Sequence, residues 1–523
     1  MNRLLSLVLL VGLSTLSLRA QSTDADIIQQ IRTEGFDNSQ VMMLMHNLTD
    51  VYGPRLTGSP SLREAGQWVL EQAEAWGLEN GEAVAWDWRN PGWENNRLSA
   101  HITAPTQDAL VVEALGWTPS TDGVVTSTVV PVQAPDSPTQ AQFDAYLADL
   151  APQVQGKIAL VGSLREVPTR FNLATLRRTD EDVARLYDPN AEPSSRSRRP
   201  RGGTEDGILS SGEVTQQLNQ FFREQGVLVR IDPSRMEDGL IRAFANRTFD
   251  PETTVPTVVM RAEDFGRITR LIDNGHEVSL EFDIQNSQYP ENTTEYNYVA
   301  EIPGSEDGVV MIGGHLDSWH AATGATDNAA GSAIMMEAMR ILSTLDVQPK
   351  RTIRMALWTG EEQGLIGSIE YVKQVFGTYE DPKPAYEGFN GYINVDSGTG
   401  KLRGATVFGP KETALVLDEL LAPFEDLDVA GARATSSRVH GGSDYTAFNH
   451  IGLPGISMGQ DPIKYFSHTW HTNVDTYERI LPEDVKQAAV VVAATAYHLA
   501  MQEEPLPRFA PDAMPPTPEP RRR

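Results

Sequence analysis

The second half of the chain holds two imidazoles and five carboxylates at points where predicted strands run into Gly-rich loops. These side chains are His315, Asp317, Asp327, Glu361, Glu362, Asp396 and His471. Imidazole nitrogens and carboxylate oxygens are the ligands that catalytic zinc sites use. The set therefore predicts a site that holds two divalent metal ions and activates a water molecule between them.

A pair of metal ions needs one ligand that reaches both, and a carboxylate can do so with its two oxygens. Asp327 is the predicted bridge, because it lies on a Gly-rich loop at the entry to a predicted helix. His315 and Asp396 are predicted to complete the ligands of one ion. Glu362 and His471 are predicted to complete those of the other, which leaves each ion open to water.

Two further carboxylates are predicted to move or orient protons. Glu361 lies beside a predicted ligand but should point elsewhere, so it is the predicted general base. Asp317 is predicted to accept the second N–H of His315 and fix its tautomer. Each motif alone has a simpler interpretation: a Glu-Glu pair usually lies on a solvated face, and an Asp before small residues often caps a helix. Their joint occurrence in this order favours the metal site.

Several nearby residues remain alternatives or secondary candidates. His468 lies three residues before His471, but the His-Thr-x-x-Asp-Thr motif favours His471 as the ligand. Tyr445 and Tyr465 are candidate donors to a developing oxyanion. His440, next to a Gly-Gly pair, is a candidate for lining the substrate cleft.

The elements that must position these residues alternate between strand and helix from residue 297 onward. Strands are predicted at 309–313, 352–358, 391–395 and 455–458, with helices at 331–345, 365–376 and 485–501. Such alternation predicts an α/β fold with a mostly parallel sheet and helices on both faces. Because sites in such sheets lie beyond the carboxyl ends of the strands, the residues that follow these strands should converge there.

The rest of the chain divides into segments without a comparable cluster. Residues 24–50 and 61–76 are predicted helices, and residues 106–289 are predicted to form a separate β-rich module. Within it, 165–212 is polar and contains an Arg-rich run near 196–201, predicted to be a solvated loop. Residues 504–523 are Pro-rich and predicted to be disordered.

Composition limits the classes of function. The chain has 523 residues and a net charge of −28, which argues against nucleic-acid binding because phosphates require clustered Lys and Arg. It has no cysteine, so disulfides are excluded. Residues 1–20 resemble a secretory signal, which predicts an exported protein, periplasmic or extracellular. An uncleaved anchor is the alternative, although the apolar run is short for a membrane span, and no other stretch is apolar enough to form one.

The motifs at 314–319, 358–364 and 395–398 resemble those of the secreted co-catalytic zinc exopeptidases, which include bacterial leucyl aminopeptidase and glutamate carboxypeptidase. They are most similar to the plasma glutamate carboxypeptidase (carboxypeptidase Q) branch, and residues 52–59 resemble its amino-terminal signature. The resemblance implies two Zn²⁺ ions, and all seven positions named above carry the expected residue types. His320 and Asn328 differ from that branch, which leaves specificity open.

The resemblance also implies a phosphorylase/hydrolase-like fold. Residues 21–105 and 290–503 would form the catalytic domain, and 106–289 an inserted protease-associated domain. The predicted function is hydrolysis of terminal peptide bonds of short peptides, with a metal-bridged hydroxide as nucleophile. The cellular metal and a homodimer both stay open.

Which end of the substrate is bound also stays open. A free amine needs acidic or carbonyl groups beside the metals, as in an aminopeptidase, whereas a free carboxylate needs Arg or a positive nest, as in a carboxypeptidase or dipeptidase. The alternative function is that of a non-catalytic binding ectodomain on the same scaffold. Such proteins should lack a ligand or the base, and here none is missing.

Overall fold

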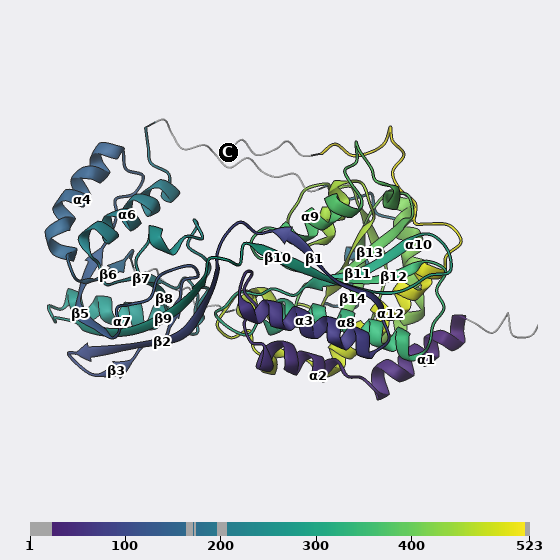
Figure 1. Cartoon of the computed structure of the whole chain (residues 1–523), viewed down its shortest axis with the longest axis horizontal. Coiled ribbons are helices and arrows are strands. Elements are labelled where there is room, and N and C mark those ends of the chain that lie inside the picture. The colour runs from purple at the N-terminus through teal and green to yellow at the C-terminus, as the bar shows by residue number, and fades with distance from the viewer. Residues whose placement is uncertain (1–23, 164–170, 172–173, 196–206, 518–523) are drawn as a thin grey trace, which may run out of the picture.

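A computed structural model describes residues 24–163, 171, 174–195 and 207–517 of the chain. The predicted signal peptide and the Arg-rich run at 196–201 lie outside these residues. The described chain folds into a larger and a smaller body, each built on an eight-stranded sheet (Figure 1). None of the helices in the described part is both long and apolar enough to cross a membrane.

The sheet of the larger body is parallel in its centre and antiparallel towards its edges. In spatial order its strands are β1 (Glu79–Asp87), β10 (Thr294–Ile302), β12 (Thr352–Trp358), β11 (Val309–His315), β13 (Phe389–Val395), β16 (Gly455–Gln460), β14 (Leu402–Phe408) and β15 (Ala432–Thr435). The four strands from β12 to β16 are parallel, whereas β1, β10 and β14 each pair antiparallel with a neighbour. The predicted mostly parallel sheet is therefore correct for the centre only, and the sheet as a whole is mixed.

Helices cover both faces of this sheet. One face packs against α1 (Asp24–Asp37), α2 (Val41–His46), α3 (Pro60–Ala75), α8 (Ala330–Thr344), α10 (Lys411–Leu421) and α12 (Pro482–Met501). The other packs against α9 (Ile366–Val375) and α11 (Tyr445–His450). The helix α12 is buried along most of its length, and its run of Ala and Val side chains lets it lie close to α8 and the sheet.

The smaller body also contains a mixed sheet with a parallel centre. Its strands, in spatial order, are β3 (Asp108–Ala109), β2 (Gly92–Ala104), β9 (Ser279–Tyr289), β5 (Val125–Val132), β6 (Ile158–Val161), β7 (Val229–Pro233), β8 (Thr257–Met260) and β4 (Val112–Ala114). The strands β5 to β8 are parallel. Helix α7 (Ala262–Asp273) packs on one face, and α4 (Gln140–Val154) and α6 (Ser211–Gln225) pack on the other.

Two features of the smaller body differ from the sequence prediction. The prediction describes it as β-rich, but it is an α/β module, since helices cover both faces of its sheet. Its sheet also begins before the predicted boundary at residue 106, because β2 pairs with β9 along Gly92–Ala104. The sequence analysis assigned β2 to the catalytic domain, because the pattern of a strand does not reveal the strand with which it pairs.

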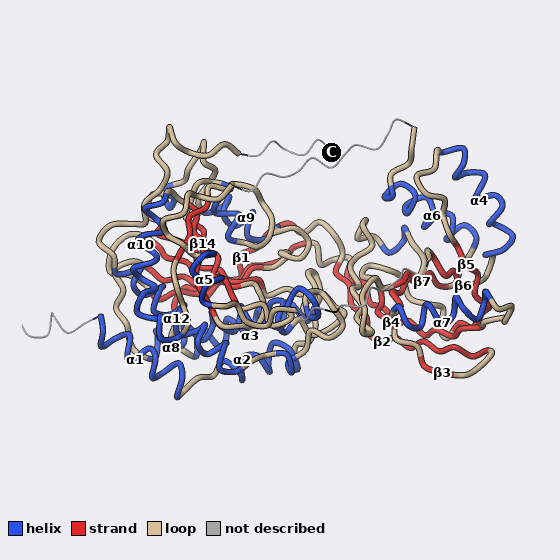
Figure 2. The backbone as a smooth tube through the Cα atoms, turned by 180° about the vertical axis from the view of Figure 1, so that it is seen from behind, coloured by secondary structure: helices blue, strands red, loops and turns tan. Residues whose placement is uncertain are grey.

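The segment around α5 (Asp180–Leu186) is helical and packed, which corrects the prediction that residues 165–212 are irregular. It leaves the smaller body and packs over β14 of the larger one (Figure 2). Tyr187 lies against Gly404 and Gly459, where a Cβ would come within 2.5 Å of its ring and within 1.7 Å of its hydroxyl, respectively. Ser194 then forms a parallel bridge with Thr435 at the sheet edge. Glycines on the sheet therefore leave the space in which this segment packs.

The carboxyl-terminal segment corrects the prediction that residues 504–523 are disordered. As far as residue 517, where the described part ends, the chain packs on the larger body. Leu506 is only 2% exposed, the Thr413 hydroxyl donates to Pro507 O at 2.7 Å, and the Arg508 guanidinium lies 5.2 Å from the Tyr386 ring centre. A Pro-rich segment forms no internal hydrogen bonds, so its backbone carbonyls can accept bonds from the larger body. Composition does not show whether such bonds form, and it therefore did not reveal the docking.

We expect Leu506→Ala to lower the free energy of unfolding by about 2–4 kcal/mol, because truncating a buried leucine leaves a cavity. Urea denaturation followed by circular dichroism measures the change. Asp512→Ala, in an exposed turn of the same segment, is the matched control and should have little effect. Equal stabilities of the two variants would contradict the docking.

Candidate metal centre and active site

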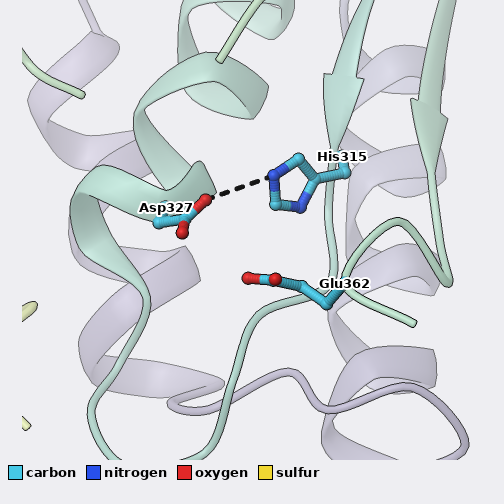
Figure 3. Close-up of side chains that lie close together, drawn as sticks. All are labelled: His315, Asp327 and Glu362. Atoms are coloured by element: carbon cyan, nitrogen blue, oxygen red, sulfur yellow. Dashed lines mark ion pairs between the residues drawn. The ribbon is translucent and has the colours of Figure 1, made fainter. Parts of the chain in front are cut away.

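The predicted site residues meet at the carboxyl edge of the parallel centre of the larger sheet. His315 is the last residue of β11, Asp396 directly follows β13, and the Glu361–Glu362 pair lies three residues beyond β12. Parallel neighbours end at the same edge, so their following residues are brought together. Figure 3 shows His315 and Glu362 reaching toward Asp327, which comes from the turn before α8.

The loop that carries Asp327 is held by buried hydrogen bonds. The amide N–H groups of Thr326 and Asp327 donate to the carboxylate of Asp475 at 2.7 and 3.1 Å. The Asn328 side chain donates to Val395 O at 2.9 Å and accepts from Gly331 N–H at the same distance. These bonds orient the Asp327 carboxylate, and they assign a supporting role to Asp475, which the sequence analysis left without one.

The two oxygens of Asp327 face two different imidazoles. Its Oδ1 lies 3.3 Å from His315 Nε2, which also lies 3.3 Å from Asp396 Oδ1. Its Oδ2 lies 3.1 Å from His471 Nε2, which also lies 2.9 Å from Glu362 Oε2. The structure therefore brings the five predicted ligands together as two groups that share one carboxylate.

The donor set fits divalent metal ions. Ligand atoms of His315, Asp327 and Glu362 all lie within 4.8 Å of one another. Glu362 Oε1 is buried and has no hydrogen-bond partner among the described residues. A buried carboxylate oxygen without a partner is costly, and a cation would satisfy it.

Burial and crowding shift the pKa values of these groups in the metal-free protein. Burial and the Asp327 charge raise the pKa of Glu362 to about 7. Burial raises the pKa of Asp475 to about 7. Burial opposes protonation of His471, but the carboxylates of Glu362 and Asp327 raise its pKa to about 10. Without a cation the site therefore retains protons, which metal binding would displace.

We expect the melting temperature of the metal-free protein to fall by at least about 3 °C between pH 5 and pH 8. Glu362 and Asp475 have pKa values raised from 4.5 and 3.8 to about 7, so the folded state binds extra protons that are lost through this window. His471 acts in the same direction, since its contribution is complete below 6.5 and is lost as pH rises through about 10.

Differential scanning fluorimetry of chelated and zinc-loaded protein across this pH range tests the expectation. The zinc-loaded sample is the control and should show a smaller fall, because the cation replaces the protons. A metal-free melting temperature that stays flat or rises from pH 5 to pH 8 would contradict the proton-binding site.

Asp317 holds the active-site loops in a different way from the one predicted. The His315 Nδ1–H donates to the backbone carbonyl of Asp317 at 2.9 Å, whereas the nearest carboxylate oxygen lies 3.6 Å away. The Asp317 carboxylate instead accepts from the amide N–H groups of Glu361 and Glu362 at 3.3 and 3.2 Å, and from the Thr57 hydroxyl at 3.1 Å. One residue thus orients an imidazole with its backbone and the Glu-Glu turn with its side chain.

Arg55 is a supporting residue that the sequence analysis missed. It is fully buried, and its guanidinium donates to the carbonyls of Leu316, Thr323 and Gly324 at 2.7, 2.9 and 3.0 Å. Burial lowers its pKa to about 10, and the nearby carboxylates oppose this shift. Arg55 therefore fixes both ends of the loop between His315 and Asp327, and only its place in a Gly-Pro turn hinted at a role.

The structure places the secondary candidate residues in different surroundings, and one of them lies beside the ligands. Tyr465 is 3% exposed, and burial and the charges of Asp327 and Asp396 raise its pKa well above the usual value, so it lies beside the ligands. His440 stacks on His450 with ring centres 3.9 Å apart. Tyr445 packs against an apolar cluster that includes Phe448. The rival histidine, His468, contacts the Ser467 hydroxyl through Nδ1 at 2.8 Å, whereas His471 joins the ligand group.

Aromatic residues surround the His471 side of the site. A small pocket there is lined by Trp319, Asp327, Glu362 and His471 among others. Phe244, contributed by the smaller body, lies with its ring centre 5.1 Å from Trp319 and 5.3 Å from His471. The smaller body therefore forms part of the wall of the site, which the sequence analysis did not foresee.

Comparisons with known proteins agree with this geometry. Residues 297–496 match the model of peptidase family M28. Carboxypeptidase Q from Mus musculus is 29% identical over 471 residues, spanning 88% of this chain and 86% of the relative. The Rattus norvegicus protein of that name is 28% identical over 467 residues, spanning 88% and 85%.

Solved structures show the same architecture. A peptidase M28 precursor from Shewanella amazonensis superposes with a TM-score of 0.62 at 25% identity, covering 93% of this chain and 99% of that one. A zinc aminopeptidase from Bacillus subtilis superposes with a TM-score of 0.53 at 18% identity, covering 90% and 98%. The second likeness concerns the fold alone.

Proposed function

We propose that this chain, a zinc exopeptidase whose residues 297–496 match the model of peptidase family M28, uses two zinc ions to hydrolyse terminal peptide bonds of short peptides. The observation that carries the two-ion proposal is the arrangement of Asp327, whose two oxygens face His315 and His471 separately. Asp396 would complete one ligand group and Glu362 the other. Other divalent metals fit the same donors.

Bound cations at these ligands would polarise the scissile carbonyl and make a water molecule acidic enough to attack it. The protein's own residues then move the protons. Glu361 lies outside the two ligand groups, and burial raises the pKa of its carboxyl well above the usual value. Such a carboxyl can take a proton from the attacking water and deliver it to the leaving amine. Its backbone N–H donates a hydrogen bond to the Asp317 carboxylate, which holds this turn in place.

Zinc titration of chelated protein tests the two-ion proposal. We expect hydrolysis of a dipeptide library to reach its maximum at two zinc ions per chain, measured by calorimetry and by amine release. Full activity at one ion per chain would contradict a bridging Asp327. Absence of bound zinc would favour the alternative, a binding protein on the same scaffold.

The substrate terminus is a separate part of the proposal. Carboxypeptidase Q names a carboxypeptidase and the Bacillus subtilis structure is that of an aminopeptidase, so relatives of both kinds share this fold. Amino-blocked and amidated dipeptides, assayed side by side with the free dipeptide, distinguish them. Cleavage of the amino-blocked peptide would exclude an aminopeptidase.

We also propose that the protein is exported and that its smaller body is the protease-associated insertion. Residues 1–20 support export, with cleavage expected after Ala20. Amino-terminal sequencing of the secreted protein tests this proposal. A mature protein that begins at Met1 would contradict it.

A further inference from the structure

A groove in the smaller body lies at the carboxyl ends of its parallel strands. One cavity of about 690 Å³ is lined by residues that follow β5, β6 and β7, among them Gln133, Gly162 and Ser234. A second cavity of about 760 Å³ shares Arg230, Arg235, Arg242 and Phe244 with it. In open parallel sheets this edge is where ligands bind. The smaller body therefore has a binding edge of its own.

This groove leads to the metal centre. Phe244 lines both cavities, is 40% exposed, and lies with its ring centre 5.3 Å from that of His471. Arg242 lies 4.8 Å above the Trp470 ring and donates to Trp470 O at 3.1 Å. The wall of the groove is thus continuous with the loop that carries His471. A peptide whose terminal bond lies at the metals can extend past Phe244 into the groove.

Four arginines line the groove together with three carboxylates: Arg230, Arg235, Arg242 and Arg247, and Asp136, Glu213 and Asp232. Basic groups therefore outnumber acidic ones there, although the chain as a whole has a net charge of −28. Arg230 is 8% exposed and held on the floor by Asp232 at 2.9 Å and Asn219 at 2.6 Å. Arg235 and Arg247 are exposed, and neither forms a hydrogen bond or ion pair with any residue that the structure describes. Two guanidinium groups are therefore available to a ligand, and they match carboxylate geometry.

We propose that this groove binds a substrate carboxylate distant from the scissile bond, so that the enzyme prefers acidic short peptides. The carboxylate is either an acidic side chain or the far terminus of the peptide. Arg235 and Arg247 would hold it, while Phe244 contacts the intervening residue. The inference rests on the proposed peptidase function and adds a substrate class to it.

Matched tetrapeptides test the proposal with zinc-loaded enzyme. One pair carries Glu or Gln at the residue farthest from the scissile bond, and each peptide is made as the free acid and as the amide. We expect kcat/KM to be about 10-fold or more higher for the Glu peptide at low salt, with the difference shrinking in high salt. If the enzyme releases amino-terminal residues, a preference for the acid over the amide instead would identify the carboxylate at the far terminus as the ligand.

Substitution of the two free arginines completes the test. The double variant Arg235→Gln/Arg247→Gln should lose the preference and leave kcat/KM for the uncharged peptide within about twofold. Arg270→Gln is the matched control, because it removes one positive charge from an exposed position on α7. A wild-type enzyme without charge preference, or a double variant that keeps it, would overturn the proposal.

Binding to the inert variant Glu361→Gln separates the groove from the peptidase function. Calorimetry with zinc-loaded Glu361→Gln should show the same Glu-over-Gln preference in Kd, and the arginine substitutions should remove it. If no peptide is hydrolysed by the wild-type protein but the binding preference persists, the proposed function fails and the groove assignment stands. If hydrolysis occurs without any preference in rate or binding, the groove assignment fails alone.

Discussion

Glu361→Gln should retain its zinc and lose about 10²–10⁴-fold in turnover, the usual contribution of a positioned general base. The substitution preserves the shape of the side chain and the hydrogen bond from the backbone N–H to the Asp317 carboxylate, but it removes the group that accepts the proton. Steady-state hydrolysis and metal analysis of the same sample measure the two effects. The prediction separates proton transfer from metal binding, since Glu361 lies outside both ligand groups.

Two controls make this result specific. Glu362→Gln should lose zinc as well as activity, because its carboxylate lies 2.9 Å from His471 in one ligand group. Glu380→Gln, at an exposed position beyond α9, should change neither quantity. Turnover of Glu361→Gln close to that of the wild type would remove Glu361 from the mechanism, even if zinc stayed bound.

Asp327→Ala should lower the zinc content below one ion per chain and reduce turnover by more than about 10⁴-fold. It deletes both oxygens that face the imidazoles, so each proposed ion loses a ligand at once. The surrounding loop should keep its conformation, because Asp475 binds the backbone amides of Thr326 and Asp327 rather than the side chain. Metal analysis after dialysis measures the loss.

Asp396→Ala provides the comparison, because its carboxylate faces only one of the two imidazoles, that of His315. We expect this variant to weaken the binding of one ion and to leave the other near its wild-type affinity. Two calorimetric binding steps should therefore become one in Asp396→Ala and disappear in Asp327→Ala. Two full sites in Asp327→Ala would show that no single carboxylate bridges them.

The central sheet and the convergence of the ligands could be predicted because both depend on patterns within short stretches of sequence. Apolar runs such as 309–313 and 391–395 identify buried strands, and His315 and Asp396 follow them directly. Once strands alternate with helices, parallel pairing brings their ends to one edge. The placement of these residues therefore needed no knowledge of distant contacts.

Other parts of the site depend on contacts that leave no periodic signal. Arg55 binds backbone carbonyls of a loop more than 250 positions away, and any loop offers carbonyls. Asp317 uses its carbonyl for His315 and its carboxylate for the Glu-Glu turn, a choice that depends on geometry alone. The smaller body contributes Phe244 across an interface between segments with unrelated patterns.

The boundary errors have the same origin. The strand pattern of β2 is clear, but its pairing with β9 rather than with the larger sheet is a tertiary fact. The segments around Tyr187 and Leu506 look polar or Pro-rich overall, yet a few contacts, including one buried side chain in each, dock them on the larger body. Composition averages over such contacts, so it predicted an irregular stretch for the first segment and disorder for the second.

The path of the chain around α5 limits how this enzyme can be rebuilt. The backbone passes between the two bodies after β1, before and after the α5 segment, and again between β9 and β10. Replacing the whole chain from β2 to β9 by that of a homologue would also replace the segment around α5. The sheet surface at Gly404 and Gly459 would then lose the segment that covers it. Grafting the smaller body between homologues therefore requires a recipient sheet with matching glycines.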